Sequence, residues 1–144
     1  MISLTSLCSF SKKRGSPHPK RRRSFGASTI TGWKPGVNDW TNQDTYFVQE
    51  EEEDKINDLK NSETKQRRRS FYAVLDGHGS NGHSVSNFCR ERLLQLLSQN
   101  NFDFDDAFSQ MQEKLESSQM DIDCSGTTCT VITISNLGEI EVRY

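Results

Sequence analysis

The residues of this chain with the clearest chemical potential are Asp76, Gly77, His78 and Gly79, which follow directly after the apolar run 71–75. A short apolar run that contains aromatic and β-branched residues is typical of a buried strand. The glycines favour a tight turn and let backbone atoms approach a ligand. The aspartate offers a hard oxygen ligand, and the histidine titrates near neutral pH. The segment indicates a metal-assisted site, and it fits equally well a polar turn in which Asp76 caps the backbone and His78 is solvated.

Strands and helices that could position this turn are visible in the pattern of apolar residues. Alternation predicts strands at residues 45–48, 71–75, 127–135 and 140–144, with a hairpin turn between the last two. Apolar residues at helical spacing predict two helices, one over 84–97 with Ser84 as its cap and one over 105–116. The order of strand, strand, helix, helix, strand, strand favours an α+β fold with antiparallel sheet.

The charge of the chain is divided unevenly between its beginning and the rest. Residues 1–31 hold seven of the 18 Lys and Arg residues and none of the 20 Asp and Glu residues. Their composition predicts a disordered basic arm, which could be a nuclear import signal, a polyanion-binding segment, an organelle transit peptide or simply a solvated tail. We expect a cytoplasmic or nuclear protein. Residues 50–69, which begin with an acidic run and end in three arginines, are predicted to be an exposed connecting loop.

Other simple patterns give narrower expectations. Arg-Arg-Arg-Ser-Phe occurs at 21–25 and 67–71, and a serine behind three arginines suits a kinase with an acidic groove, so Ser24 is a predicted kinase target. Ser70 is less suited because it enters a predicted strand. The four cysteines and three histidines do not have the paired spacing of a structural zinc site. No apolar run is long enough to span a bilayer, and the arm lacks the interleaved aromatic residues typical of nucleic-acid binding.

Three blocks of the sequence, taken together, resemble the metal-dependent serine/threonine protein phosphatases of the PPM type, or type 2C. They are GWKPGVNDWTNQDTYFV at 32–48, FYAVLDGHGSNGHSVSNFCRERL at 71–93 and DCSGTTCTVITI at 123–134. The resemblance implies the N-terminal portion of an α/β/β/α sandwich with mainly antiparallel sheets, in which 32–144 form an incomplete phosphatase domain. It also implies hydrolysis of phosphoserine and phosphothreonine in proteins with the help of two Mg²⁺ or Mn²⁺ ions.

By the same resemblance, individual residues of the blocks take roles in the reaction. Asp76 would bridge two metal ions, and the Gly77 carbonyl would be a ligand, while His78 would protonate the leaving group as a general acid. Asp44 would stand behind the ligands and orient a ligand or a water molecule. No arginine lies between Thr31 and Asp44, so Lys34 is the predicted contact for the substrate phosphate. The turn at 125–128 is predicted to support the site from behind.

The family's remaining acidic blocks would follow Tyr144, so the sequence resembles the N-terminal part of a catalytic domain. We expect the 144-residue chain to be inactive by itself, unless Asp121 and Asp123 replace the further acidic ligands. The alternative is a non-catalytic interaction protein that presents a truncated phosphatase fold to its partners.

Overall fold

The computed structural model describes residues 2–3, 25–33, 35–36, 41–54 and 67–144, and these fall into two units, 1–40 and 41–144. In the first unit, β1 (Ile2–Ser3) and β2 (Ser28–Thr29) form a short antiparallel pair. This pair differs from the disordered arm predicted for 1–31. Lys34, Ser24 and both basic clusters lie outside the described residues.

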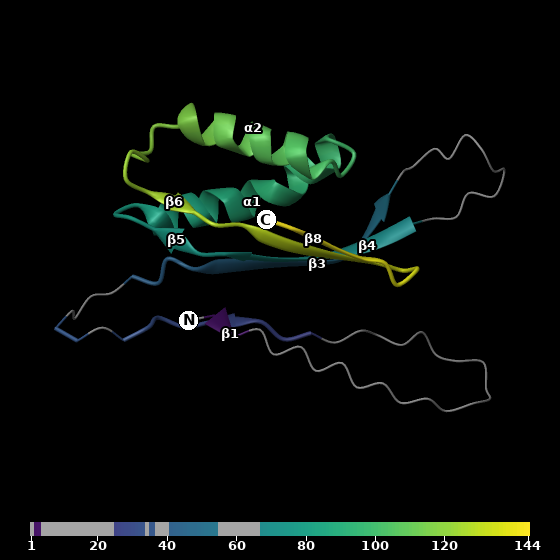
Figure 1. The fold of residues 1–144 in the computed structure, drawn as a ribbon, viewed down its shortest axis with the longest axis horizontal. Coiled ribbons are helices and arrows are strands. Elements are labelled where there is room, and N and C mark those ends of the chain that lie inside the picture. Colours follow the sequence, from purple (N-terminus) through teal and green to yellow (C-terminus); the bar gives the residue numbers. More distant parts are fainter. Residues whose placement is uncertain (1, 4–24, 34, 37–40, 55–66) are drawn as a thin grey trace. The chain divides into compact units, whose positions relative to one another are not determined.

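The second unit contains one four-stranded antiparallel sheet, one small two-stranded sheet and two helices (Figure 1). In the large sheet, the strands stand in the order β3 (Thr45–Asp54), β4 (Arg67–Leu75), β7 (Thr130–Ser135) and β8 (Ile140–Arg143). The small sheet pairs β5 (Gly77–His78) with β6 (Gly126–Thr127). The helices are α1 (Gly82–Gln99) and α2 (Phe104–Glu116). The fold is α+β with antiparallel sheets, as the sequence predicted.

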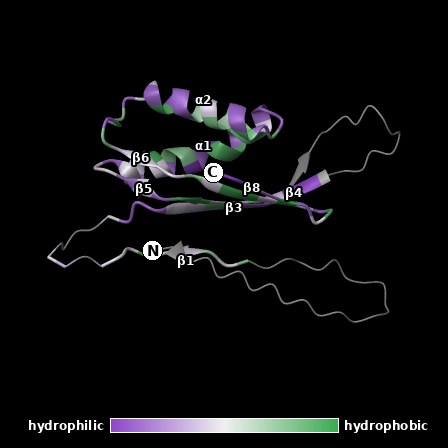
Figure 2. Ribbon diagram, in the orientation of Figure 1, coloured by the Kyte–Doolittle hydropathy of each residue, from purple (hydrophilic) through white to green (hydrophobic). Residues whose placement is uncertain are grey.

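The core of the second unit lies between the helices and one face of the large sheet. Phe71, Ala73 and Leu75 alternate along β4 with half-buried residues, as a strand with one covered face requires. They pack with buried residues of both helices and of β7, namely Val85, Cys89, Leu93, Leu96, Leu97, Phe104, Ala107, Met111, Leu115 and Val131. Figure 2 shows the hydrophobic residues concentrated in α1 and the sheet, whereas α2 is largely hydrophilic on its outer side.

The opposite face of the large sheet is also apolar. Registered neighbours Tyr72 and Ile132 lie on it beside Val142, and the first two are only half-buried while Val142 is 48% exposed. Such a face suits packing against a second sheet, which is the arrangement in the four-layer sandwich. The described part of the chain supplies one helical layer and one sheet layer of that sandwich.

Two predicted boundaries are wrong, and each has a physical reason. Residues 50–54 and 67–69 are strand instead of loop, because β3 and β4 continue as a ribbon in which Glu52, Glu53 and Asp54 register with Arg69, Arg68 and Arg67. Residues 55–66 lie outside the described part.

The start of α1 is the second correction. The helix begins at Gly82, so Ser84 is not its cap, and Asn81 stands at the cap position without a side-chain capping bond. The Asn81 side chain donates instead to the carbonyl of Asp121. By contrast, Asp103 caps α2 by accepting from the Asp106 amide, close to the predicted start. In the described residues, no helix is both long and apolar enough to cross a membrane.

Candidate active site

Asp76 occupies the short link between β4 and β5, at the end of the buried strand. Its backbone is held by Thr128, the residue after β6, since the Thr128 amide donates to the Asp76 carbonyl at 2.9 Å and the Asp76 amide donates to Thr128 Oγ1 at 3.2 Å. The side chain of Asp76 is exposed. The carboxylate is therefore presented to solvent from a backbone that is fixed on both sides.

The glycines around Asp76 are required by close packing of the backbone. A Cβ at Gly77 would lie 2.5 Å from the carbonyl oxygens of Gln43 and Gly82. Gly79 has φ of +83°, and a Cβ there would overlap the carbonyl oxygen of Cys124. The sequence suggested that the glycines let backbone atoms approach a ligand, and the structure gives packing against neighbouring backbone as a further reason for Gly77.

Gln43 connects the first block to this turn. Its backbone carbonyl accepts from the Gly77 amide at 3.2 Å and from Ser86 Oγ at 2.7 Å. Its side-chain amide donates to the Gly79 carbonyl at 2.7 Å. These bonds fix the end of β5 and the start of α1 against the residue that precedes Asp44. Sequence reasoning missed the roles of Ser86 and of the Gln43 side chain here, because neither bond leaves a local pattern.

The carboxyl groups of Asp44 and Asp76 are brought together. Burial raises the pKa of Asp44 above its ordinary value, and the negative charge of Asp76 and a hydrogen bond between the two side chains raise it further. Two neighbouring carboxyl groups repel each other when both are ionised. A cation bound between them would remove that repulsion, so the donor set fits a divalent metal ion that prefers oxygen ligands.

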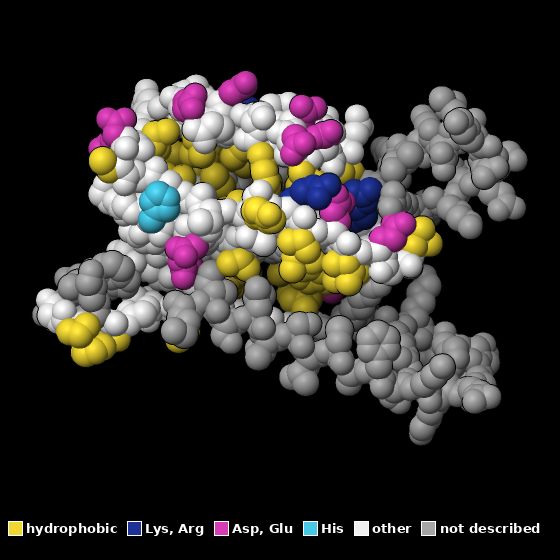
Figure 3. All heavy atoms as spheres, viewed as in Figure 1, with side chains coloured by type: hydrophobic (Ala, Val, Ile, Leu, Met, Phe, Trp, Pro, Cys, Tyr) yellow, Lys and Arg dark blue, Asp and Glu magenta, His cyan; other side chains and the backbone are white. Residues whose placement is uncertain are grey.

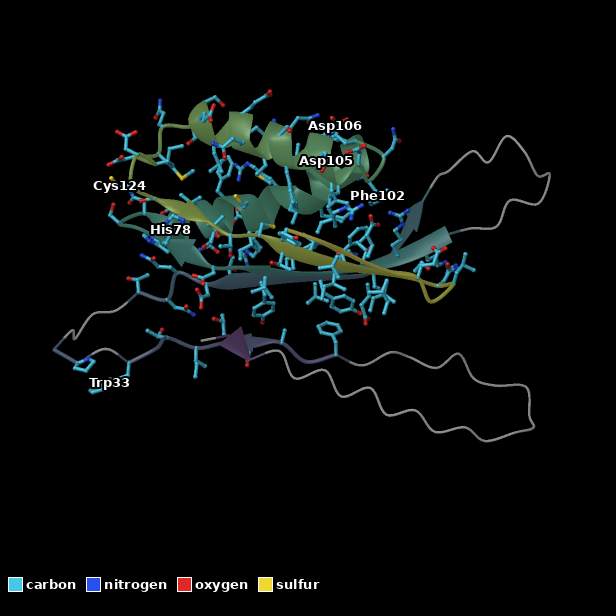
Figure 4. The ribbon with its side chains drawn as sticks, in the orientation of Figure 1. Trp33, His78, Phe102, Asp105, Asp106 and Cys124 are labelled. Carbon is cyan, nitrogen blue, oxygen red and sulfur yellow. The ribbon has the colours of Figure 1, made fainter. Side chains whose placement is uncertain are left out.

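His78 lies at the end of the unit where β5 and β6 meet, and its side chain is exposed (Figure 4). Its ring covers Gly126, where an added Cβ would lie 2.8 Å from Nε2. Asp76 precedes β5 and His78 ends it, so the two exposed side chains are separated by one residue.

The turn at 125–128 is hydrogen-bonded to residues on both sides of β5. Ser125 Oγ accepts from the Asn81 amide at 2.9 Å, which ties the β5–α1 turn to the segment before β6. Asp121 and Asp123 are exposed in the connection between α2 and β6. Within the described residues, no group of three or more His, Cys, Asp and Glu side chains is placed to hold a metal ion, so these two aspartates do not complete the Asp44–Asp76 pair.

A groove opens beside the site between α1, α2 and the β5–β6 sheet, with a volume of about 340 Å³. His78, Ser125 and Thr127 line one end, and apolar residues of both helices line the rest. Cys89 and Cys129 also face this groove. Burial raises the pKa of Cys89 to about 11 and that of Cys129 to about 12, with the neighbouring Cys89 adding to the latter, so both thiols stay protonated at neutral pH.

Comparison with known proteins identifies the family of the chain. Residues 44–142 match the family model described as protein phosphatase 2C. A curated relative, "Probable protein phosphatase 2C 35" of Arabidopsis thaliana, is 30% identical over 125 residues, which cover 82% of this chain and 33% of the relative. The chain belongs to the protein phosphatase 2C family. It spans about a third of the length of this relative.

Proposed function

We propose that the protein hydrolyses phosphoserine and phosphothreonine in other proteins and that it uses Mg²⁺ or Mn²⁺ to do so. Membership of the protein phosphatase 2C family supports a phosphatase activity. The observation that supports a metal-dependent activity is the close approach of the Asp44 and Asp76 carboxyl groups at the end of β4. A cation bound near two mutually repelling carboxylates favours their ionised form.

Asp76 is the side chain that would hold the metal in this part of the site, with the Gly77 carbonyl as a further oxygen ligand, while Asp44 would stand behind them and orient a ligand or a water molecule. Divalent ions of this kind take about six or more oxygen ligands, so water and other oxygen atoms would complete the shell. When bound, the ions would neutralise the charge of a phosphate dianion and make a water nucleophile available near neutral pH.

The chain's own residues would perform the remaining steps. His78 would give a proton to the alkoxide of the departing serine or threonine, since an exposed imidazole at the edge of the site can exchange its proton with water afterwards. Gln43 would keep Asp76 and His78 in register by holding the Gly77 amide and the Gly79 carbonyl. Lys34 remains the proposed contact for the substrate phosphate.

Phosphate release from a phosphoserine peptide by the full-length product of the gene tests the proposal. We expect the rate to depend on Mn²⁺ and to fall in Asp76→Asn to less than about a tenth of the wild-type rate, because one lost metal contact costs several kcal/mol of barrier. Asp105→Asn is the matched control, since it removes the same charge from an exposed position in the first turn of α2, outside the carboxylate pair. A wild-type protein without Mn²⁺-dependent release would favour the alternative, a phosphatase fold that serves as a non-catalytic interaction protein.

A second substrate separates the role of His78 from that of Asp76. We expect His78→Ala to slow release from a phosphoserine peptide by about 10²-fold or more, the ordinary contribution of a general acid. Nitrophenyl phosphate should be affected much less, because its leaving group needs little protonation. Equal losses on both substrates would mean that His78 organises the site instead of donating a proton.

A further inference from the structure

The groove beside the site shares one wall with the reaction centre. His78 belongs both to the proposed catalytic residues and to the lining of the groove, together with Ser125 and Thr127. Beyond these polar residues the walls become apolar, formed by side chains of both helices, namely Val85, Leu93, Phe108, Met111 and Leu115. Most of these apolar side chains are buried, since Val85, Leu93, Met111 and Leu115 are only 1–7% exposed. Figure 3 shows apolar atoms below α2, with the His78 ring at their lower left.

We propose that this groove receives an apolar side chain of the phosphoprotein substrate, two to four residues from the phosphorylated serine or threonine. The proposal rests on the function proposed above, because it assumes that the phosphate is placed beside His78. A volume of about 340 Å³ is within the range of pockets that bind small apolar groups, and mostly apolar walls with a few polar groups at one end are typical of them. An extended peptide advances about 3.3 Å per residue, so such a residue reaches about 7–13 Å from the phosphate.

The charge at the rim of the groove restricts which substrates fit. Gln112, which lines the groove, donates to Glu116 Oε1 at 2.8 Å, so this carboxylate lies at the rim. Ile122 also lines the groove, and its neighbours Asp121 and Asp123 are exposed. Figure 3 shows acidic side chains along α2 above the apolar surface. A negative rim attracts positive side chains and repels negative ones, so the preferred substrate has Lys or Arg beside its apolar residue.

Two phosphopeptides that differ at one position test the apolar contact. Both carry phosphoserine and two lysines, and one has leucine three residues from the phosphoserine where the other has serine. In the full-length gene product with Mn²⁺, we expect kcat/KM to be about tenfold higher for the leucine peptide, the order expected for burying one such side chain. Nitrophenyl phosphate, which has neither the leucine nor the lysines of the peptide, provides the reference rate for the reaction itself.

A charge reversal at the rim tests the second half of the inference. Glu116→Lys should lower kcat/KM for the lysine-containing peptide by about fivefold at low salt and leave the nitrophenyl phosphate rate unchanged. Glu113→Lys is the matched control on the same helix, because helical periodicity directs position 113 away from the stripe of Phe108, Met111 and Leu115. Melting curves of both variants check that each is folded as well as the wild type.

The outcomes separate the inference from the proposed function. A preference for the leucine peptide that Glu116→Lys reduces and Glu113→Lys does not would support the groove as a substrate site. Equal kcat/KM for both peptides, with nitrophenyl phosphate hydrolysed, would overturn the groove and leave the phosphatase intact. Equal decreases of kcat/KM in Glu116→Lys and Glu113→Lys would contradict the position of Glu116 at the rim of the groove. No release from any substrate would overturn the proposed function and, with it, the inference.

Discussion

Gly79 and Gly138 form a matched pair for testing how tightly the turn of the site is packed. Both adopt the left-handed conformation, with φ of +83° and +86°. An added Cβ at Gly79 would overlap the carbonyl oxygen of Cys124 and lie 2.7 Å from the Cα of Ser125. At Gly138, in the turn between β7 and β8, a Cβ would meet nothing within 4 Å. The same substitution by alanine therefore separates backbone strain from steric overlap.

The expected losses of unfolding free energy follow from the backbone strain and the steric overlap. Holding an L residue in the left-handed region costs about 1–2 kcal/mol, and alanine recovers about 0.4–1 kcal/mol by restricting the unfolded chain. Gly138→Ala should then lower the free energy of unfolding by about 1 kcal/mol. Gly79→Ala carries the same terms plus about 1–3 kcal/mol for forcing a methyl group into packed backbone, so we expect a loss of about 2–4 kcal/mol.

Urea unfolding followed by circular dichroism measures both losses on the same helices. The difference between the variants is the informative quantity, since any effect common to glycine replacement cancels. If Gly79→Ala has no cooperative transition while Gly138→Ala retains one, the ranking is still as expected. A Gly79→Ala variant that is as stable as Gly138→Ala would contradict the packing of the site's turn beneath residues 124–125.

Three further predictions concern parts of the second unit away from the carboxylate pair. Phe102, labelled in Figure 4, stacks on Phe71 with 5.4 Å between the ring centroids. Phe102→Ala should therefore lower the free energy of unfolding in urea by about 2 kcal/mol. The control Leu137→Ala, at an exposed position, should lower it by less than about 0.5 kcal/mol. At pH 8, iodoacetamide should modify exposed Cys124 before Cys89 and Cys129, as read by peptide mass mapping, because burial raises the pKa of those two thiols. Burial favours the protonated thiols, so their contribution to the free energy of unfolding should be fully present below the ordinary thiol pKa of 9.0. This contribution should be lost as the pH rises toward 11. Equal losses for the two substitutions, or equal labelling of the three thiols, would contradict these assignments.

Helix α2 and the turn at Asp76 could be predicted from the sequence because their signals are local. Asp103 and the acidic first turn mark the start of α2, and the apolar stripe marks its buried face. The apolar run and the glycines likewise mark the end of β4. Helix α1 was predicted with less accurate ends, because its start is set by Asn81 and by glycine packing instead of by a serine cap.

The features that the sequence did not predict depend on contacts between distant residues. The acidic run and the arginine run each favour solvated loop when taken alone, and only their antiparallel register reveals a ribbon. The hydrogen bond from the Gln43 side chain to the Gly79 carbonyl joins residues 36 positions apart, so no local spacing in the sequence predicts it. The groove was missed for the same reason, since its apolar residues were predicted correctly as helix stripes and only packing leaves a space between them.

Binding of Mn²⁺ to the full-length gene product tests most directly whether the Asp44–Asp76 pair is a metal site. Electron paramagnetic resonance of free Mn²⁺ gives the affinity without requiring turnover. We expect Asp76→Asn to weaken binding by at least about tenfold, since even residues behind the ligands change metal affinity by that factor. Asp105→Asn, with the same loss of charge, should bind as the wild type does. Wild-type affinity in Asp76→Asn, or an equal loss in both variants, would contradict a metal centre at the end of β4.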